Sequence, residues 1–171
     1  MKSAIITFHR ARNYGSALQA YALNSYLNKG ENSAETIDFH TSAQDEMYKI
    51  FKKMSSPKNV LYNLLSLVKY RELKLKIKRF DDFIKNDIKL TQKEFKGEAG
   101  LEELNDKYDL FVCGSDQIWN PVCKDFSKAY LLDFVQDKSK CISYAASMGK
   151  TEIPPENLDN FRKLMQRLDR I

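Results

Sequence analysis

The sequence predicts an α/β fold, a Rossmann-like three-layer domain with a mostly parallel sheet and a helical insertion in the middle of the chain. Three observations support this prediction. A buried strand pattern at residues 2–8 is followed by a helical pattern at 16–29 and a second strand pattern at 34–39. So short a strand–helix–strand unit implies parallel strands joined by a right-handed crossover. Further strand patterns at 109–113 and 141–146 extend the same sheet.

Each expected helix has its own local signal. Ser16 is a plausible N-cap of the first helix, and Gly30 follows its end. Pro57 stands in the first turn of an amphipathic helix, and residues 70–86 form a longer, basic one. Shorter helices are expected at 99–105 and 156–168, and extended segments at 88–91 and 129–134. The two helices between strands place an insertion at residues 41–97 of a single domain that spans residues 1–171.

Composition restricts the class of protein. The chain of 171 residues is 43% hydrophobic and 30% charged, which is typical of a soluble globular domain. No apolar run is long enough to cross a bilayer, and the N-terminal run is too short for a secretion signal. Cys113, Cys123 and Cys141 form no CxxC pair and no metal-ligand cluster. We therefore expect a reduced, cytoplasmic protein without a disulfide framework or a metal site.

Positive charge is concentrated in the middle of the chain. Residues 41–96 hold 14 Lys or Arg against 7 Asp or Glu, whereas the whole chain has a net charge of only +5. Such a segment is most often the solvated face of helices. It also fits nucleic acid, an anionic membrane surface or an acidic polymer. Only Tyr70 and Phe80 are interleaved with the basic residues, which disfavours nucleic acid. Association of the basic helices with the inner face of the membrane is the alternative partner that we keep.

The stretch 108–121, YDLFVCGSDQIWNP, changes from a strand pattern to a polar turn within two residues. Loops beyond the carboxyl ends of parallel strands are where α/β domains bind ligands. The alternative is a turn in which Asp116 caps the next segment and Trp119 belongs to the core. The candidate binding residues in this stretch are Gly114, Ser115, Gln117, Trp119 and Asn120, beside Asp116.

Two further loops are expected at the same edge of the sheet. One is HRARNYGS at 9–16, which enters a helix whose free N–H groups favour an anion, and the other is SMG at 147–149. Neither GxGxxG nor GxxxxGK[ST] occurs, which argues against a dinucleotide and against ATP held by a P-loop. Asn13 and Tyr14 could bind a sugar or phosphate, or serve only the turn and its packing. Gly15 and Ser147 complete the candidate binding set.

Three titratable side chains are candidates for acid–base chemistry. His9 and His40 each follow a predicted strand, and Asp116 is the best-placed carboxylate, either as a base or as the group that orients a hydroxyl. Each also has a structural interpretation, as a buried histidine or a carboxylate that caps a turn. No Ser-His-Asp order and no paired-carboxylate spacing is present.

Four stretches together resemble the N-terminal half of the polysaccharide pyruvyl transferase family. They are AIITFHRARNYGSALQAYAL at 4–23, YDLFVCGSDQIWNP at 108–121, YLLDF at 130–134 and ISYAASMG at 142–149. They occur in the family's order and are spread over the chain, and GSDQIWN with NYG and YAAS is specific to the family. The basic segment matches only in its helical character.

The resemblance implies a glycosyltransferase-B-like architecture, in which a cleft separates two Rossmann-like domains. It also implies transfer of a pyruvyl group from phosphoenolpyruvate, with no other cofactor, onto a sugar or lipid-linked saccharide as a ketal, in bacterial-type polysaccharide synthesis. The chain would be the acceptor-side domain, a fragment that lacks the second domain and is inactive alone. His9, Asn13, Tyr14 and Asp116 would face the sugar, with Asp116 and His9 catalytic. The alternative is a non-catalytic domain that binds a nucleotide-sugar or an anionic glycan.

Overall fold

The computed structural model describes residues 1–149 and 152–168, and a parallel sheet forms the centre of this part of the chain. The sheet has the strand order β3-β2-β1-β4-β5, and every neighbouring pair is parallel. The predicted sheet is therefore confirmed, and it is parallel throughout. Its strands are β1 (Lys2–Ile6), β2 (Ser33–His40), β3 (Leu90–Lys96), β4 (Leu110–Gly114) and β5 (Cys141–Tyr144).

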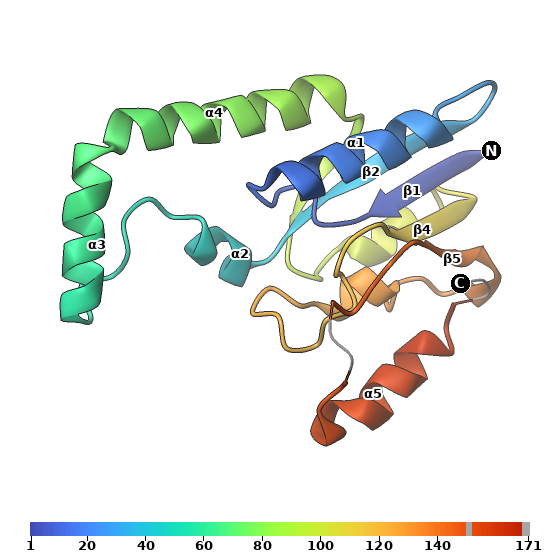
Figure 1. The fold of residues 1–171 in the computed structure, drawn as a ribbon. Coiled ribbons are helices and arrows are strands. Elements are labelled where there is room, and N and C mark those ends of the chain that lie inside the picture. The colour runs from blue at the N-terminus through green and yellow to red at the C-terminus, as the bar shows by residue number, and fades with distance from the viewer. Residues whose placement is uncertain (150–151, 169–171) are drawn as a thin grey trace.

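Helices cover both faces of the sheet and complete the predicted three layers. Figure 1 shows α1 and α4 over one face, with α5 and short 3-10 segments over the other. The α-helices are α1 (Tyr14–Leu27), α2 (Ser42–Met47), α3 (Pro57–Val68), α4 (Tyr70–Asp87) and α5 (Pro155–Met165). The 3-10 helices are η1 (Leu101–Leu104), η2 (Lys128–Leu131) and η3 (Lys138–Lys140).

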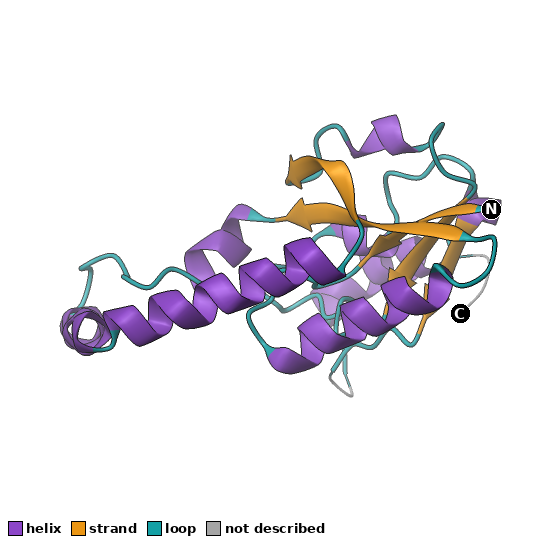
Figure 2. Cartoon of the chain, turned by 90° about the horizontal axis from the view of Figure 1, so that it is seen from above, coloured by secondary structure: helices purple, strands orange, loops and turns teal. Residues whose placement is uncertain are grey.

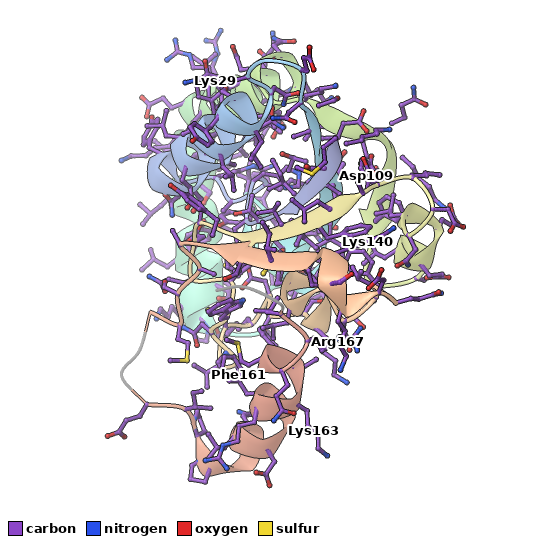
Figure 3. The ribbon with its side chains drawn as sticks, turned by 90° about the vertical axis from the view of Figure 1, so that its right-hand side faces the viewer. Lys29, Asp109, Lys140, Phe161, Lys163 and Arg167 are labelled. Carbon is purple, nitrogen blue, oxygen red and sulfur yellow. The ribbon has the colours of Figure 1, made fainter. Side chains whose placement is uncertain are left out.

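The two central strands are apolar on both faces. Ile6 and Phe111 belong to the larger core cluster, beneath the 3-10 segments and α5, whereas Ile5 and Val112 pack toward α1. Strands covered on both sides need such continuous apolar runs. Phe161 lies on the side of α5 that faces the sheet and joins the larger cluster (Figure 3). The core thus holds β1 and β4 rigidly, and the loops that leave them start from fixed points.

Several predicted boundaries were wrong for local reasons. The first helix is capped by Asn13, not Ser16, and begins at Tyr14 because the Asn13 side chain accepts the backbone N–H of Ser16. The segment expected to be extended at 129–134 instead contains η2, whose first turn is capped by Ser127. Only a 3-10 turn, η1, forms in the predicted helix at 99–105. In the first two cases a side-chain cap hydrogen bond decides where the helix begins, and residue periodicity does not reveal such a bond.

The predicted insertion, 41–97, is shorter than expected because its last part is the edge strand β3. The sequence of β3, LTQKEFK, has few apolar residues, and only Thr91 and Phe95 within it are buried, so its strand signal is weak. The C-terminal half of α4 packs on α1 through Phe80 and Ile84. The N-terminal half of α4 and all of α3 extend away from the domain, beyond the carboxyl ends of the strands (Figures 1 and 2).

Candidate functional site

The candidate site lies where the sheet changes winding direction, between β1 and β4. The chain crosses from β1 to β2 on one side and from β4 to β5 on the other. At such a switch point the loops diverge, which leaves room for a ligand beyond the carboxyl ends of the strands. The first loop enters α1, and the second contains Asp116. Ser16 Oγ donates a hydrogen bond to Asp116 Oδ2 at 2.7 Å and joins the two loops.

The α1 side of the site is shaped by the cap of that helix. Asn13 has an extended backbone, and its side-chain oxygen accepts the Ser16 N–H at 3.1 Å. Asn13 thus serves the turn, as one of its two predicted roles requires. Its side chain is nevertheless exposed. The Tyr14 ring packs on Phe80 of α4, with 5.0 Å between centroids, and Gly15 is exposed beside it. The predicted residues of this loop are brought together at the start of α1.

Backbone hydrogen bonds hold the loop after β4 against the loop after β5. Ser115 N–H donates to the Tyr144 carbonyl at 2.9 Å, and Ser147 N–H donates to the Asp116 carbonyl at 2.9 Å. Gly114 has φ +153°, and a Cβ there would stand 2.0 Å from the Tyr144 oxygen. Only glycine permits this approach. The two loops lie at the same edge of the sheet, as predicted, and these hydrogen bonds join them into one unit.

The side chains of this unit divide into accessible and buried groups. Gln117 and Ser147 are exposed, and Ser115 is half-buried with φ +67°. Trp119 and Asn120 are each 6% exposed. Trp119 is therefore a core residue, which was the alternative to a role in binding. Asn120 accepts the Val122 N–H within its own loop. These two residues shape the loop from below, while Gln117 and Ser147 are available to a ligand.

Trp119 also lies beside a buried thiol. Burial raises the pKa of Cys113 to about 12, and its contact with Trp119 only partly opposes that effect. A thiol with so high a pKa stays protonated at neutral pH and is a poor nucleophile. Cys113 is thus a core residue.

An acidic and aromatic cluster surrounds Asp116. Asp125 is 8% exposed, and its burial, together with the neighbouring charge of Asp116, raises its pKa. Burial and the charges of Asp125 and Asp116 also raise the pKa of Tyr130 and, against the opposing effect of Arg12, that of Tyr48. The Tyr130 hydroxyl is buried and has no hydrogen-bond partner within residues 1–149 and 152–168. Asp125 in this cluster therefore keeps its proton to a higher pH than an ordinary aspartate does, because its pKa is raised.

Most residues of this cluster could not be predicted from the sequence. Tyr48 comes from the end of α2, and Tyr130 from η2, which was expected to be extended. Arg12 approaches Tyr48 through a 2.8 Å hydrogen bond from its guanidinium to the Tyr48 carbonyl. Asp125 could have been suspected from the sequence, because it lies in the same loop as Asp116. The other three meet only through tertiary packing.

His9 lies in a buried ion-pair network instead of the accessible site. Its Nε2 is 3.1 Å from Asp38 Oδ1, and its side chain has no exposed surface. Arg10 donates two hydrogen bonds to the same carboxylate, at 2.6 and 2.8 Å, and pairs with Glu94 at 2.9 Å. Burial opposes ionisation of Asp38, but the hydrogen bonds from His9 and Arg10 outweigh it and hold its pKa well below the usual range.

His40 has the same structural character, with Nδ1 2.8 Å from Asp45. The structure thus brings Asp116 together with Asn13, Gly15, Gln117 and Ser147. Both histidine rings are buried, each beside a carboxylate. Within the described residues, no group of three or more His, Cys, Asp or Glu side chains could hold a metal ion. In the same part of the chain, every helix is too short or too polar to cross a membrane.

A parallel sheet with this strand order, and with polar loops joined at its switch point, defines a Rossmann-like domain whose candidate site lies at the carboxyl edge of the sheet. Comparison with known families then identifies the particular group. Residues 13–171 match the family model described as "Polysaccharide pyruvyl transferase", so the chain belongs to the polysaccharide pyruvyl transferase family. The resemblance inferred from the four sequence stretches is confirmed. No curated protein and no solved structure matches the chain.

Proposed function

We propose that this chain is the N-terminal, acceptor-side domain of a polysaccharide pyruvyl transferase, with phosphoenolpyruvate as the donor and no additional cofactor. The observation that supports it most is the position of Asp116. Its carboxylate stands at the switch point of the sheet and accepts one hydrogen bond from Ser16 Oγ and another from the Gln117 N–H, both at 2.7 Å. A carboxylate oriented in this way is prepared to receive the hydroxyl of a saccharide.

The chemistry of ketal formation requires such a group. Two sugar hydroxyls add to the central carbon of the enolpyruvyl group, and the bond from that carbon to the phosphate oxygen breaks. One hydroxyl proton ends on the methylene carbon, which becomes a methyl group, and the other leaves with inorganic phosphate. We assign Asp116 as the base for a sugar hydroxyl. Asp125, whose pKa is raised by burial and by Asp116, is suited to holding a proton nearby.

The remaining predicted residues have supporting roles in this proposal. Asn13, Tyr14, Gly15, Gln117 and Ser147 offer exposed groups to the saccharide, with Ser115 beside them. Gly114, Trp119 and Asn120 fix the loop that bears Asp116. His9 acts through Asp38 and Arg10, because a fully buried ring does not reach a substrate. Its contribution is to position the loop that leads into α1.

We also propose that the chain alone is inactive, because the two arginines of its first loop are not available to the donor. Phosphoenolpyruvate carries a phosphate and a carboxylate, which enzymes bind through Arg and Lys. The two arginines of the first loop are already engaged. Arg10 pairs with Asp38 and Glu94, and Arg12 binds the Tyr48 carbonyl and lies 3.9 Å from Asp81. A second Rossmann-like domain would supply these cations across a glycosyltransferase-B-like cleft.

Calorimetric titration with saccharides and with phosphoenolpyruvate tests this assignment. We expect the chain to bind acceptor saccharides and to release no phosphate from phosphoenolpyruvate. Asp116→Asn should weaken saccharide binding about tenfold, because the charged acceptor of a hydroxyl is lost. Asp106→Asn, a change of the same kind at an exposed position away from the loops, is the control. When the chain is joined to a second domain that restores turnover, normal activity of the Asp116→Asn enzyme would exclude the role as base.

A non-catalytic domain that binds a nucleotide-sugar or an anionic glycan is the second candidate. The engagement of Arg10 and the burial of His9 favour it, since neither group is available for chemistry. Saccharide binding that persists without any phosphate release, even with the second domain present, would select this alternative.

A further inference from the structure

Helix α3 presents its apolar side chains to solvent instead of to the domain. Its outward residues are between 42 and 85% exposed, and Ser66 is the only buried residue of the helix. A helix of a globular domain normally turns its apolar stripe toward the core. The exposed apolar residues of α3 are Val60, Leu61, Tyr62, Leu64, Leu65, Leu67 and Val68.

The inner side of α3 is polar, and its asparagine side chains form hydrogen bonds with the preceding loop. These bonds fix which side of the helix faces outward. Asn63 donates to the Lys52 carbonyl at 2.8 Å and accepts the Lys52 N–H at 2.8 Å. Asn59 donates to the Lys53 carbonyl at 2.8 Å and to Ser55 Oγ at 3.1 Å. These hydrogen bonds tie the preceding loop to one face of the helix. Rotating the helix to turn its leucines inward would break these hydrogen bonds, so the apolar face is held outward.

Positive charge surrounds this apolar helix. Residues 49–80, which we call the arm, contain ten Lys or Arg and a single acidic residue, Glu72. Within the arm, residues 59–68 carry no charge at all. Lys52, Lys53 and Lys58 come before this uncharged run, and Lys69 and Arg71 follow it. An apolar helix between clusters of cations combines the two features that bind a protein to an anionic membrane surface.

We propose that the arm binds the surface of an anionic lipid bilayer, with α3 lying in the interface and its flanking Lys and Arg on the headgroups. The helix has 12 residues, too few to cross the hydrocarbon core, so it would lie along the surface. Its leucines would enter the boundary between headgroups and acyl chains, where they leave water. Phospholipids with anionic headgroups are therefore the ligand.

The charge of the arm argues against the other occupants of this face. A second copy of the chain would bring two strongly positive arms together, and their repulsion opposes such a dimer. Nucleic acid would meet the cations but would leave the exposed leucines in water. An anionic bilayer satisfies both the apolar and the charged parts of the surface.

The position of the arm is compatible with this docking. It projects from the end of the domain at which the strands terminate, so no other element of the sheet lies between α3 and a flat surface there (Figures 1 and 2). The Ser16–Asp116 site faces the same end. The end of the arm, at Lys76 and Phe80, lies next to Tyr14. Membrane binding is nevertheless independent of the transfer reaction, because it uses α3 and its flanking cations and not the Ser16–Asp116 pair.

Co-sedimentation with lipid vesicles tests the proposal. The chain should bind vesicles of equal phosphatidylglycerol and phosphatidylcholine, bind pure phosphatidylcholine at least about tenfold more weakly, and detach as salt is raised. The triple variant Leu61→Ser, Leu64→Ser, Leu65→Ser should bind vesicles more than about tenfold more weakly, because it removes three leucine side chains that would be buried in the bilayer. These side chains are exposed in the domain, so circular dichroism should show an unchanged fold.

Matched charge-reversal variants distinguish binding through the cations of the arm from attraction by the overall positive charge of the protein. Lys69→Glu, Lys74→Glu, Lys76→Glu should reduce binding at least about 100-fold. The same change at Lys29, Lys107 and Lys163, exposed residues outside the arm, should have a clearly smaller effect; Lys29 and Lys163 are seen far apart in Figure 3. Equal losses in both charge variants, full binding by the leucine variant, or no binding to anionic vesicles would overturn the proposal. A dimer, or an RNA complex, that the leucine variant abolishes while vesicle binding persists would overturn it too.

Discussion

Ser16 Oγ donates a hydrogen bond to Asp116 Oδ2 at 2.7 Å, although 100 residues separate them in the sequence. The bond connects the first turn of α1 to the loop that follows β4. These two elements leave neighbouring strands of the sheet and diverge, and the side-chain hydrogen bond joins them beyond the carboxyl ends of those strands. The shape of the candidate site therefore depends on this pair.

A double-mutant cycle on Ser16→Ala and Asp116→Ala measures this coupling. We expect an interaction energy of about 1–2 kcal/mol in urea unfolding, because the acceptor is charged and the bond is partly buried. The cycle of Ser16→Ala with Asp106→Asn should be additive, since Asp106 lies elsewhere on the surface. Additivity in both cycles would show that the hydrogen bond contributes nothing to the fold.

Gly114→Ala should destabilise the domain by more than about 3 kcal/mol, because the new Cβ would overlap the Tyr144 carbonyl and force the two loops apart. Gly97→Ala is the matched control. Gly97 also has a positive φ, +85°, but nothing lies within 4 Å of its Cβ position. Its replacement should cost about 1 kcal/mol from backbone strain alone. Chemical denaturation of both variants gives the comparison, and equal losses would contradict the proposed overlap.

Asp125→Asn should stabilise the domain at pH 7 by about 1 kcal/mol. Folding raises the pKa of Asp125, so the native state holds the proton more tightly than the unfolded chain does. Stability from this group is complete below the ordinary aspartate pKa and decreases as the pH rises through the native value. The variant and the parent should therefore be equally stable near pH 3. Unfolding at the two pH values checks this, and a destabilised variant at pH 7 would show that the charged form is needed.

Asp38→Asn should destabilise the domain by about 2 kcal/mol at pH 7, because buried His9 and half-buried Arg10 lose the charged acceptor of their hydrogen bonds. The pKa of Asp38 is lowered in the native state, so its stabilising effect is present above the ordinary aspartate pKa and is lost as the pH falls below it. The difference between variant and parent should shrink as the pH is lowered from 5 to 2. A difference that is constant with pH would mean that packing, not charge, accounts for the loss.

Much of the sheet was predictable because its central strands are apolar on both faces. Runs such as that of β1 and β4 have no other stable environment, and α1 between β1 and β2 requires them to be parallel. The edge strand β3 was only partly anticipated. It is mostly polar and takes its strand conformation from pairing with β2. The apolar pattern of α3 predicted a helix correctly, but it did not reveal that the apolar side faces solvent.

Local patterns and short motifs were enough to predict the fold class, the family and the loop that bears Asp116. The tertiary structure decided which side chains meet at that loop. Ser16 reaches Asp116 only because β1 and β4 are neighbours, and Asp125 acquires its raised pKa only when packing buries it beside that charge. It also decided that His9 is fully enclosed with Asp38. Burial and electrostatic coupling are properties of the assembled chain, and no stretch of residues contains them.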